Sequence, residues 1–249
     1  MSLNSTEMVR NRNSNQKGRV TLDRAISKLG LGSRVEAQAW IEAGRVKVHG
    51  SVETNKARLV NPDTAHIEID GAKASKSESK IYLFHKPKGV VTTKRDPEGR
   101  KTIYDLLPDS LQSFHPVGRL DMHTTGLLLL TNDTRISSYL TDPKNEVPRV
   151  YLVGVKGEVI ESVVKKMEAG VEDLGELLRA QSAKVLKASG RESLLRLELT
   201  EGKNREIRRL CLCLGHEVIS LKRTSFGPYE LADLEPGKVI EALDFNKLR

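Results

Sequence analysis

Asp121 is a carboxylate in a polar loop rich in hydrogen-bond donors, within the run G-R-L-D-M-H-T-T-G-L-L-L-L-T-N-D at residues 118–133. The apolar run Leu127 to Leu130 follows directly, bounded by Gly126 and Asn132. A short continuous apolar run of this kind predicts a β-strand that is buried on both faces. The pattern therefore holds an acid rigidly at the edge of a core, a position suited to a catalytic nucleophile or base.

A second segment concentrates positive charge. The run N-R-E-I-R-R-L-C-L-C-L-G predicts a helix that Asn204 caps and Gly215 ends. Arg205, Arg208 and Arg209 cluster near its N-terminal end, away from its apolar stripe, and repel one another unless an anion lies near. That anion is either a carboxylate of the protein or an RNA phosphate. A solvated surface cluster is the alternative interpretation.

Composition indicates the class of partner. The chain has 249 residues, with 41 basic and 33 acidic side chains and a net charge of +8. A basic excess favours a polyanionic partner, with nucleic acid ahead of a membrane, although general solubility is the alternative. Aromatic residues make up only 4%, which predicts an aliphatic core.

The two cysteines, Cys211 and Cys213, have neither the spacing of a zinc pair nor that of a redox pair. They predict ordinary thiols in a reducing cytoplasm. We find no apolar stretch of the ~20 residues that a membrane span needs and no signal-peptide pattern. The sequence therefore predicts a cytoplasmic protein without a membrane partner and without a metal site.

Composition along the chain divides it into four parts. Residues 1–17 are polar and predict a disordered tail, and residues 18–69 form a small module. Residues 70–80 are small, polar and charged, which predicts a flexible linker. Residues 81–249 form a larger domain.

The small module has the pattern of two helices and a strand. Apolar residues from Leu22 to Leu29 have helical spacing, and Ser33 with Glu36 forms the capping box of a second helix. The alternation at residues 45–53 predicts a half-buried strand with a turn at residues 49–50. Five basic residues are candidates to follow an RNA backbone: Arg24, Lys28, Arg34, Arg45 and Lys47. A solvated charged face is the alternative.

The larger domain mixes strands and helices irregularly. Strand-like segments are residues 81–85, 149–155, 193–200 and 217–223, and extended structure is expected again at residues 90–93. Residues 161–169 predict a helix that ends at Gly170. Because strands outnumber helices and do not alternate with them, the pattern predicts an α+β fold with a mixed, mainly antiparallel sheet.

Four motifs in this domain, in this order, resemble the pseudouridine synthases that modify bacterial ribosomal RNA. They are K-P-K-G at 86–89, the Asp121 run, R-V-Y at 149–151 and E-G-K-N-R-E-I-R-R-L at 201–210. Residues 20–50 resemble an S4 domain, a small RNA-binding module. The chain is thus similar to the subfamily that places an S4 module before the catalytic domain.

The resemblance implies roles for particular residues. Asp121 falls on the catalytic aspartate, Tyr151 on the active-site tyrosine, and Arg208 on the arginine that pairs with the aspartate. It implies a uridine flipped out of its helix, no metal and no cofactor. The larger domain's implied RNA contacts are Lys86, Arg119, Asn204 and Arg205. The chain departs from the family at Val35, Thr134 and Arg149, where a basic residue, glycine and lysine are usual.

The expected activity is the isomerisation of uridine to pseudouridine in ribosomal RNA, with a lean toward the large subunit and small-subunit RNA as the alternative. The partner is ribosomal RNA or a ribosomal assembly particle, and the expected state is a monomer. One competing hypothesis is a non-catalytic assembly factor that binds RNA. A glycosidase is the other, but it needs two facing carboxylates, and no second acid lies in a comparable motif.

Overall fold

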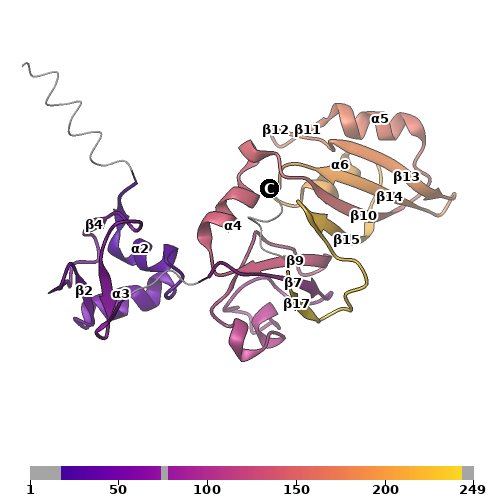
Figure 1. Cartoon of the computed structure of the whole chain (residues 1–249). Helices are drawn as coiled ribbons and strands as arrows, with labels where there is room; N and C mark the ends of the chain where they lie inside the picture. The colour runs from indigo at the N-terminus through magenta and orange to yellow at the C-terminus, as the bar shows by residue number, and fades with distance from the viewer. Residues whose placement is uncertain (1–17, 74–77, 243–249) are drawn as a thin grey trace, which may run out of the picture. The chain divides into compact units, whose positions relative to one another are not determined.

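The computed structural model describes residues 18–73 and 78–242, and the chain divides into two compact units between Glu78 and Ser79 (Figure 1). The predicted tail, residues 1–17, lies outside the described residues. The predicted linker is wrong at its start, because Ala72–Lys73 forms strand β6. This strand pairs with Ile69 and Glu68 of β5 and so extends the sheet of the first unit.

The N-terminal unit contains the predicted helices and strand. Its elements are β1 (Val20–Thr21), α2 (Leu22–Lys28), α3 (Arg34–Glu42), β2 (Val46–Val48), β3 (Ser51–Val52), β4 (Leu59–Val60), β5 (Ile67–Ile69) and β6. The capping box of Ser33 and Glu36 is formed at the start of α3. Leu22, Ile26 and Ile41 are completely buried and join the two helices to the sheet through a shared core.

A buried carboxylate, Asp23, connects the two helices. It accepts hydrogen bonds from the Thr21 hydroxyl, the Arg24 backbone N–H, the Arg34 guanidinium and the Gln38 amide. Burial alone would raise the pKa of Asp23, but these hydrogen bonds outweigh it and lower the pKa to about 2. The Asp23 carboxylate therefore accepts hydrogen bonds that its neighbours would otherwise donate to water.

We expect the substitution Asp23→Ala to destabilise the N-terminal unit by about 2 kcal/mol, because it removes a buried acceptor that is bonded to several groups of the two helices. Trp40, the chain's one tryptophan, lies in α3, so its fluorescence during urea unfolding reports on this unit. The exposed Asp63→Ala is the matched control. Since the pKa of Asp23 is lowered, its stabilisation is present above about pH 4 and is lost as pH falls toward 2. An equal midpoint for both variants would contradict this role.

The larger unit is built on a nine-stranded sheet with the order β13-β14-β10-β15-β9-β7-β17, with β16 paired to β15 and β8 to β9. Its strands are β7 (Ile81–Lys86), β8 (His115–Pro116), β9 (Thr125–Thr131), β10 (Arg149–Lys156), β13 (Ser182–Ala188), β14 (Glu192–Leu199), β15 (Val218–Phe226), β16 (Tyr229–Glu230) and β17 (Val239–Glu241). A separate hairpin is formed by β11 (Val171–Asp173) and β12 (Glu176–Leu178). The helices are α4 (Thr134–Thr141), α5 (Glu161–Ala169) and α6 (Glu206–Cys213), with short 3₁₀ turns η1 (Ile103–Asp105), η2 (Asp109–Leu111) and η3 (Pro143–Asn145).

Two antiparallel halves of this sheet meet where β9 and β15 run parallel (Figure 1). The register there pairs Gly126 with Arg223. Gly126 has a φ of +102°, and a Cβ at this position would lie 2.2 Å from the Arg223 carbonyl oxygen. Only glycine fits this seam, because any side chain would collide with backbone.

β9 is the buried strand that the apolar run predicted, with all four of its leucines at 0% exposure. Leu127 and Leu129 pack on one face with Ile136 and Leu140 of α4. Leu128 and Leu130 pack on the other face with Phe84 and the segment that contains η1 and η2. The strand is therefore fixed from both sides, and so is the loop that precedes it.

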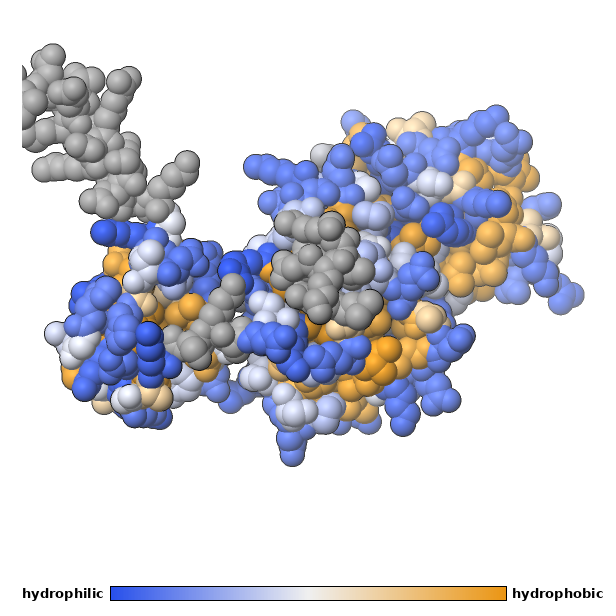
Figure 2. Space-filling view, in the orientation of Figure 1, coloured by the Kyte–Doolittle hydropathy of each residue, from blue (hydrophilic) through white to orange (hydrophobic). Residues whose placement is uncertain are grey.

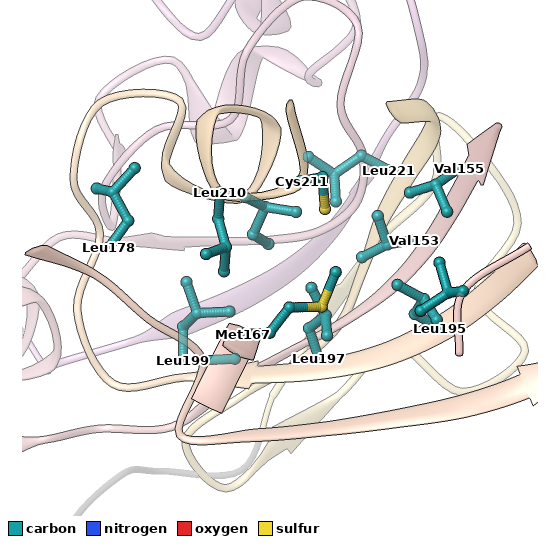
Figure 3. Packing of buried hydrophobic residues seen from close by; sticks show 13 residues of the cluster. Val153, Val155, Met167, Leu178, Leu195, Leu197, Leu199, Leu210, Cys211 and Leu221 are labelled. Atoms are coloured by element: carbon teal, nitrogen blue, oxygen red, sulfur yellow. The ribbon is translucent and has the colours of Figure 1, made fainter. Parts of the chain in front are cut away.

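The other half of the sheet carries α5 and α6 on one face. Figure 3 shows Leu210 and Cys211 of α6 over Val153 and Leu197 of the sheet, and Met167 of α5 belongs to the same cluster. This packing confirms the predicted helix at 161–169 and the apolar stripe of α6. The same packing fixes the position of α6 on the sheet.

Two local predictions are wrong. Asn204 does not cap α6, because the helix begins at Glu206 and the preceding Arg205 has a left-handed φ of +49°. Residues 90–93 form no strand and contribute an isolated bridge between Val91 and Thr102.

The face in Figure 2 is mainly hydrophilic, in keeping with a charged content of 30%. No helix in residues 18–73 or 78–242 is both long and apolar enough to cross a membrane.

Candidate active site

The loop that carries Asp121 has its backbone fully anchored. The Leu120 carbonyl accepts a hydrogen bond from the Thr92 hydroxyl at 2.8 Å, and the Asp121 carbonyl accepts one from the Thr124 N–H at 3.0 Å. The Met122 carbonyl accepts one from the Gly89 N–H at 2.8 Å. These bonds fix the backbone and leave the Asp121 side chain 43% exposed.

Lys86 supplies a further anchor from beneath the loop. Its Nζ donates to the carbonyl oxygens of Thr124 at 2.9 Å and Pro87 at 3.1 Å, with Met122 at 3.5 Å. The side chain is completely buried, so the expected contact of Lys86 with RNA is wrong. Burial lowers the pKa of Lys86 to about 8, against the pull of Asp121, which raises it. Lys86 therefore holds the loop through hydrogen bonds, and its positive charge interacts with the Asp121 carboxylate.

The arginine nearest to Asp121 is Arg205. Its Nη1 lies 3.9 Å from Asp121 Oδ2. Arg208, expected to form this pair, donates instead to the carbonyl oxygens of Val218 at 3.3 Å and His123 at 3.4 Å. Burial and the charge of Arg205 lower the pKa of Arg208, while Asp121 raises it. Arg208 thus anchors the same loop and acts on the carboxylate through its charge.

The third arginine of the cluster pairs with protein carboxylates. Arg209 Nε lies 2.5 Å from Asp173 Oδ2, and its Nη1 lies 2.6 Å from Glu176 Oε2. These partners flank the turn of the β11–β12 hairpin. Of the two anions predicted for the cluster, a protein carboxylate is the partner of Arg209, which ties the hairpin to α6.

A cavity of about 380 Å³ opens beside Asp121. Tyr151 and Arg119 line it together with Arg205 and Arg208. Tyr151 lies in β10 opposite Leu197 of β14 and is half-buried. The volume lies in the range of small-ligand pockets. The structure therefore brings the predicted carboxylate, tyrosine and arginines around one cavity that can hold a single base.

The inner wall of the cavity contains residues that sequence reasoning missed. Arg149 is buried, and its guanidinium donates to the carbonyl oxygens of Thr200 at 3.1 Å and Leu140 at 2.9 Å. Its Cζ lies 4.7 Å from the centre of the Phe226 ring. Arg223 is also buried and lies 4.8 Å from the same ring centre. The alternation of residues along β15 could have indicated that Arg223 is buried, because it lies on the same face of the strand as the buried Leu221.

Two glutamates of the wall, Glu201 and Glu206, interact with each other. Glu206 is buried, its Oε2 accepts from the Lys203 N–H at 3.0 Å, and its carboxyl lies within hydrogen-bond reach of Glu201. Burial raises the pKa of Glu206, and the neighbouring Glu201 raises it further. Lys203 Nζ pairs with Glu201 at 2.5 Å. The hydrogen bond from the Lys203 N–H to Glu206 closes the turn that places Arg205.

We expect Glu206→Gln to raise the melting temperature at pH 8 by a few degrees and to leave it nearly unchanged at pH 5. The amide reproduces the neutral acid's hydrogen bonds. Because the pKa of Glu206 is raised, its stabilisation is complete at low pH and is lost as pH rises through the folded-state pKa. An effect of about 1 kcal/mol corresponds to ~2–4 °C for a protein of this size. Circular dichroism melts against the exposed Glu230→Gln measure it; a lower melting temperature at pH 8 would contradict the raised pKa of Glu206.

The basic residues predicted for the N-terminal unit all lie at least partly on its surface. Arg24 is exposed, and Lys28 and Lys47 are half-buried. Arg34 is 59% exposed although it pairs with Asp23, and Arg45 pairs with Asp70 at 2.5 Å. In the larger unit, Arg119, Asn204 and Arg205 are exposed. All of these side chains remain accessible to a polyanion.

Comparison with known proteins gives one consistent result. Residues 80–212 match the family model described as RNA pseudouridylate synthase, and residues 20–65 match that of the S4 domain. The chain is 36% identical to the ribosomal large subunit pseudouridine synthase B of Bacillus subtilis, over 88% of this chain and 91% of that protein. It is 35% identical to an uncharacterized RNA pseudouridine synthase of Aquifex aeolicus, over 88% of each chain. A crystal structure titled pseudouridylate synthase matches with a TM-score of 0.63 at 28% identity, covering 90% of this chain and 96% of that one.

Proposed function

We propose, since this chain belongs to the RNA pseudouridylate synthase family, that it isomerises a uridine of ribosomal RNA to pseudouridine. The observation that carries the proposal is the cavity of about 380 Å³ that joins Asp121 and Tyr151 with Arg205 and Arg208. The relatives named for the large ribosomal subunit favour large-subunit RNA as the substrate. The S4 domain favours structured RNA as the partner, bound through the exposed basic residues of the N-terminal unit.

The reaction needs a base outside its helix and an ionised carboxylate. The C1′–N1 bond of the uridine breaks, the uracil turns, and its C5 bonds to C1′; the C5 proton leaves and N1 gains one. Asp121 acts on the nucleotide as nucleophile or base, and both routes require its charged form. Lys86, Arg205 and Arg208 place positive charge close to the Asp121 carboxylate.

Two further residues have proposed roles at the cavity. Tyr151 stacks on the uracil ring, and its hydroxyl is placed to relay the C5 proton. Arg119, two positions before Asp121 and exposed at the cavity, occupies the space that the flipped uridine leaves in the RNA. The proposed setting is the cytoplasm, with one chain acting on ribosomal RNA or on a partly assembled particle, without metal or cofactor.

The test is tritium release from transcripts of the two large ribosomal RNAs labelled at uracil C5. We expect release from the large-subunit transcript and none from a transcript labelled at cytosine C5. Release from the small-subunit transcript alone would correct the substrate. Absence of release from both transcripts and from partly assembled particles, with RNA binding retained, would favour a non-catalytic assembly factor.

A further inference from the structure

Arg223 presents a buried hydrogen-bond donor that has no acceptor among residues 18–73 and 78–242. The residue is 3% exposed and lines the cavity beside Asp121. Its Nε donates to the Leu127 carbonyl oxygen at 2.7 Å, whereas its Nη2 is buried without a partner. A buried donor without an acceptor costs on the order of 1–3 kcal/mol. The fold thus keeps an unsatisfied donor in the wall of its active-site cavity.

The charge of Arg223 is also uncompensated. Within the described ranges, neither Arg223 nor Arg149 forms an ion pair with a carboxylate. The two guanidinium groups lie near one ring, that of Phe226. Burial lowers the pKa of Arg149, and the charge of Arg223 also lowers it, whereas Tyr151 and Glu206 raise it. The inner wall therefore carries buried positive charge, which favours a negative charge that forms inside the cavity.

One other buried polar atom of the cavity wall lacks a hydrogen-bond partner, but a neighbouring residue of the protein can satisfy it. Glu206 Oε1 is buried and unpaired, but it lies beside Glu201 and is satisfied when Glu206 holds a proton. Arg223 Nη2 has no such neighbour. It is therefore the polar atom of the wall that points to a ligand.

The chemistry of the proposed reaction identifies the matching group. When the C1′–N1 bond breaks, its electron pair leaves with N1, and the uracil ring becomes an anion whose charge spreads onto its two carbonyl oxygens. The pair that later joins C5 to C1′ comes from this ring. A phosphate is charged and hydrated before the reaction begins, so the exposed Arg119 and Arg205 are better placed to bind it than the buried Arg223. A single buried donor suits a base carbonyl.

We propose that Arg223 Nη2 donates a hydrogen bond to a carbonyl oxygen of the target uracil and stabilises the anion formed when the glycosidic bond breaks. This role rests on the proposed function. It makes Arg223 a catalytic residue of the oxyanion-stabilising kind. Its charge acts more strongly on the ring after bond cleavage than before, so it accelerates the reaction and adds little to RNA affinity.

The test compares Arg223→Met with Lys222→Met, the neighbouring residue of the same strand, which does not line the cavity. Single-turnover tritium release, RNA dissociation constants and melting temperatures are measured for both variants and for the unmodified chain. We expect Arg223→Met to slow release about 100-fold, as for loss of one oxyanion donor, with an unchanged Kd. Lys222→Met should release tritium at the rate of the unmodified chain.

A rescue experiment covers a variant that folds poorly. Arg223→Ala with added guanidinium ion should regain part of its rate, compared with sodium chloride at equal ionic strength, and Arg223→Lys should be intermediate. Release by Arg223→Met at the unmodified rate would overturn the proposal. A loss confined to Kd, or a lowered melting temperature without guanidinium rescue, would also overturn it. Absence of release by the unmodified chain would refute the proposed function itself, and with it the role of Arg223.

Discussion

Asp121→Asn is expected to reduce tritium release from the substrate RNA by about 10⁴-fold or more, as does loss of the central nucleophile or base of an enzyme. The amide has the same shape but neither the charge nor the basicity of the carboxylate. RNA affinity should remain, because the basic surfaces of both units are untouched.

The fold should tolerate this substitution. The loop is held by its carbonyl groups, which the variant retains. The side chain is 43% exposed and has an ion pair with Arg205 at 3.9 Å, which contributes little to stability. Melting temperatures and single-turnover assays beside the exposed control Asp109→Asn separate the two effects. A variant that keeps a tenth of the activity would exclude Asp121 as the catalytic carboxylate.

Lys86→Met is expected to slow the reaction about 100-fold, an effect of about 2.7 kcal/mol on the barrier. The change removes the donor shared by the carbonyl oxygens of Thr124 and Pro87 and the positive charge that faces Asp121. Lys88→Met is the matched control, since Lys88 is an exposed lysine of the same turn. Equal rates for the two variants would show that the buried amine has no role in positioning Asp121.

The pH dependence of the reaction follows from the same residue. Because the pKa of Lys86 is lowered to about 8, the rate of the unmodified chain should fall above pH 8 as the amine loses its proton. Between pH 8 and about 10.5 the unfolded chain binds more protons at this lysine than the folded chain, so this group makes the fold more stable as pH rises. The deprotonation of Lys86 therefore does not by itself destabilise the fold. A profile that stays flat to pH 9 would contradict this assignment.

Several elements could be predicted because local pattern decides them. The apolar run of β9 is buried on both faces as its composition indicates, and Ser33 and Glu36 form their capping box. The start of α6 could not be predicted in this way. Glu206 accepts a hydrogen bond from the Lys203 N–H, and this turn places Arg205, not Asn204, before the helix. A contact between a glutamate side chain and the backbone thus overrides the cap preference of asparagine.

The candidate site was predicted as a set of residues, but not as a set of contacts. Asp121, Tyr151 and Arg208 do line one cavity, yet the arginine nearest the carboxylate is Arg205. The turn before α6 decides this, since Arg205 has a left-handed φ of +49° there, and no sequence pattern predicts that conformation. Lys86 was misassigned as an RNA contact, although strand alternation in β7 places it on the face of the buried Phe84. The roles of Lys86, Arg205 and Arg208 depend on the groups that they contact in the folded protein, and their spacing in the sequence does not show these contacts.

The parallel seam between β9 and β15 also bears on how activity is acquired during folding. Arg223 and Leu127, joined across it, are 96 positions apart, whereas each half of the sheet contains antiparallel strands much closer in the chain. Closing the longer loop costs more conformational entropy and follows the more local pairings. Asp121 and Tyr151 belong to opposite halves. The β7–β9 and β10–β14 pairs can therefore form while the molecule is still inactive, and catalysis begins only when the seam closes.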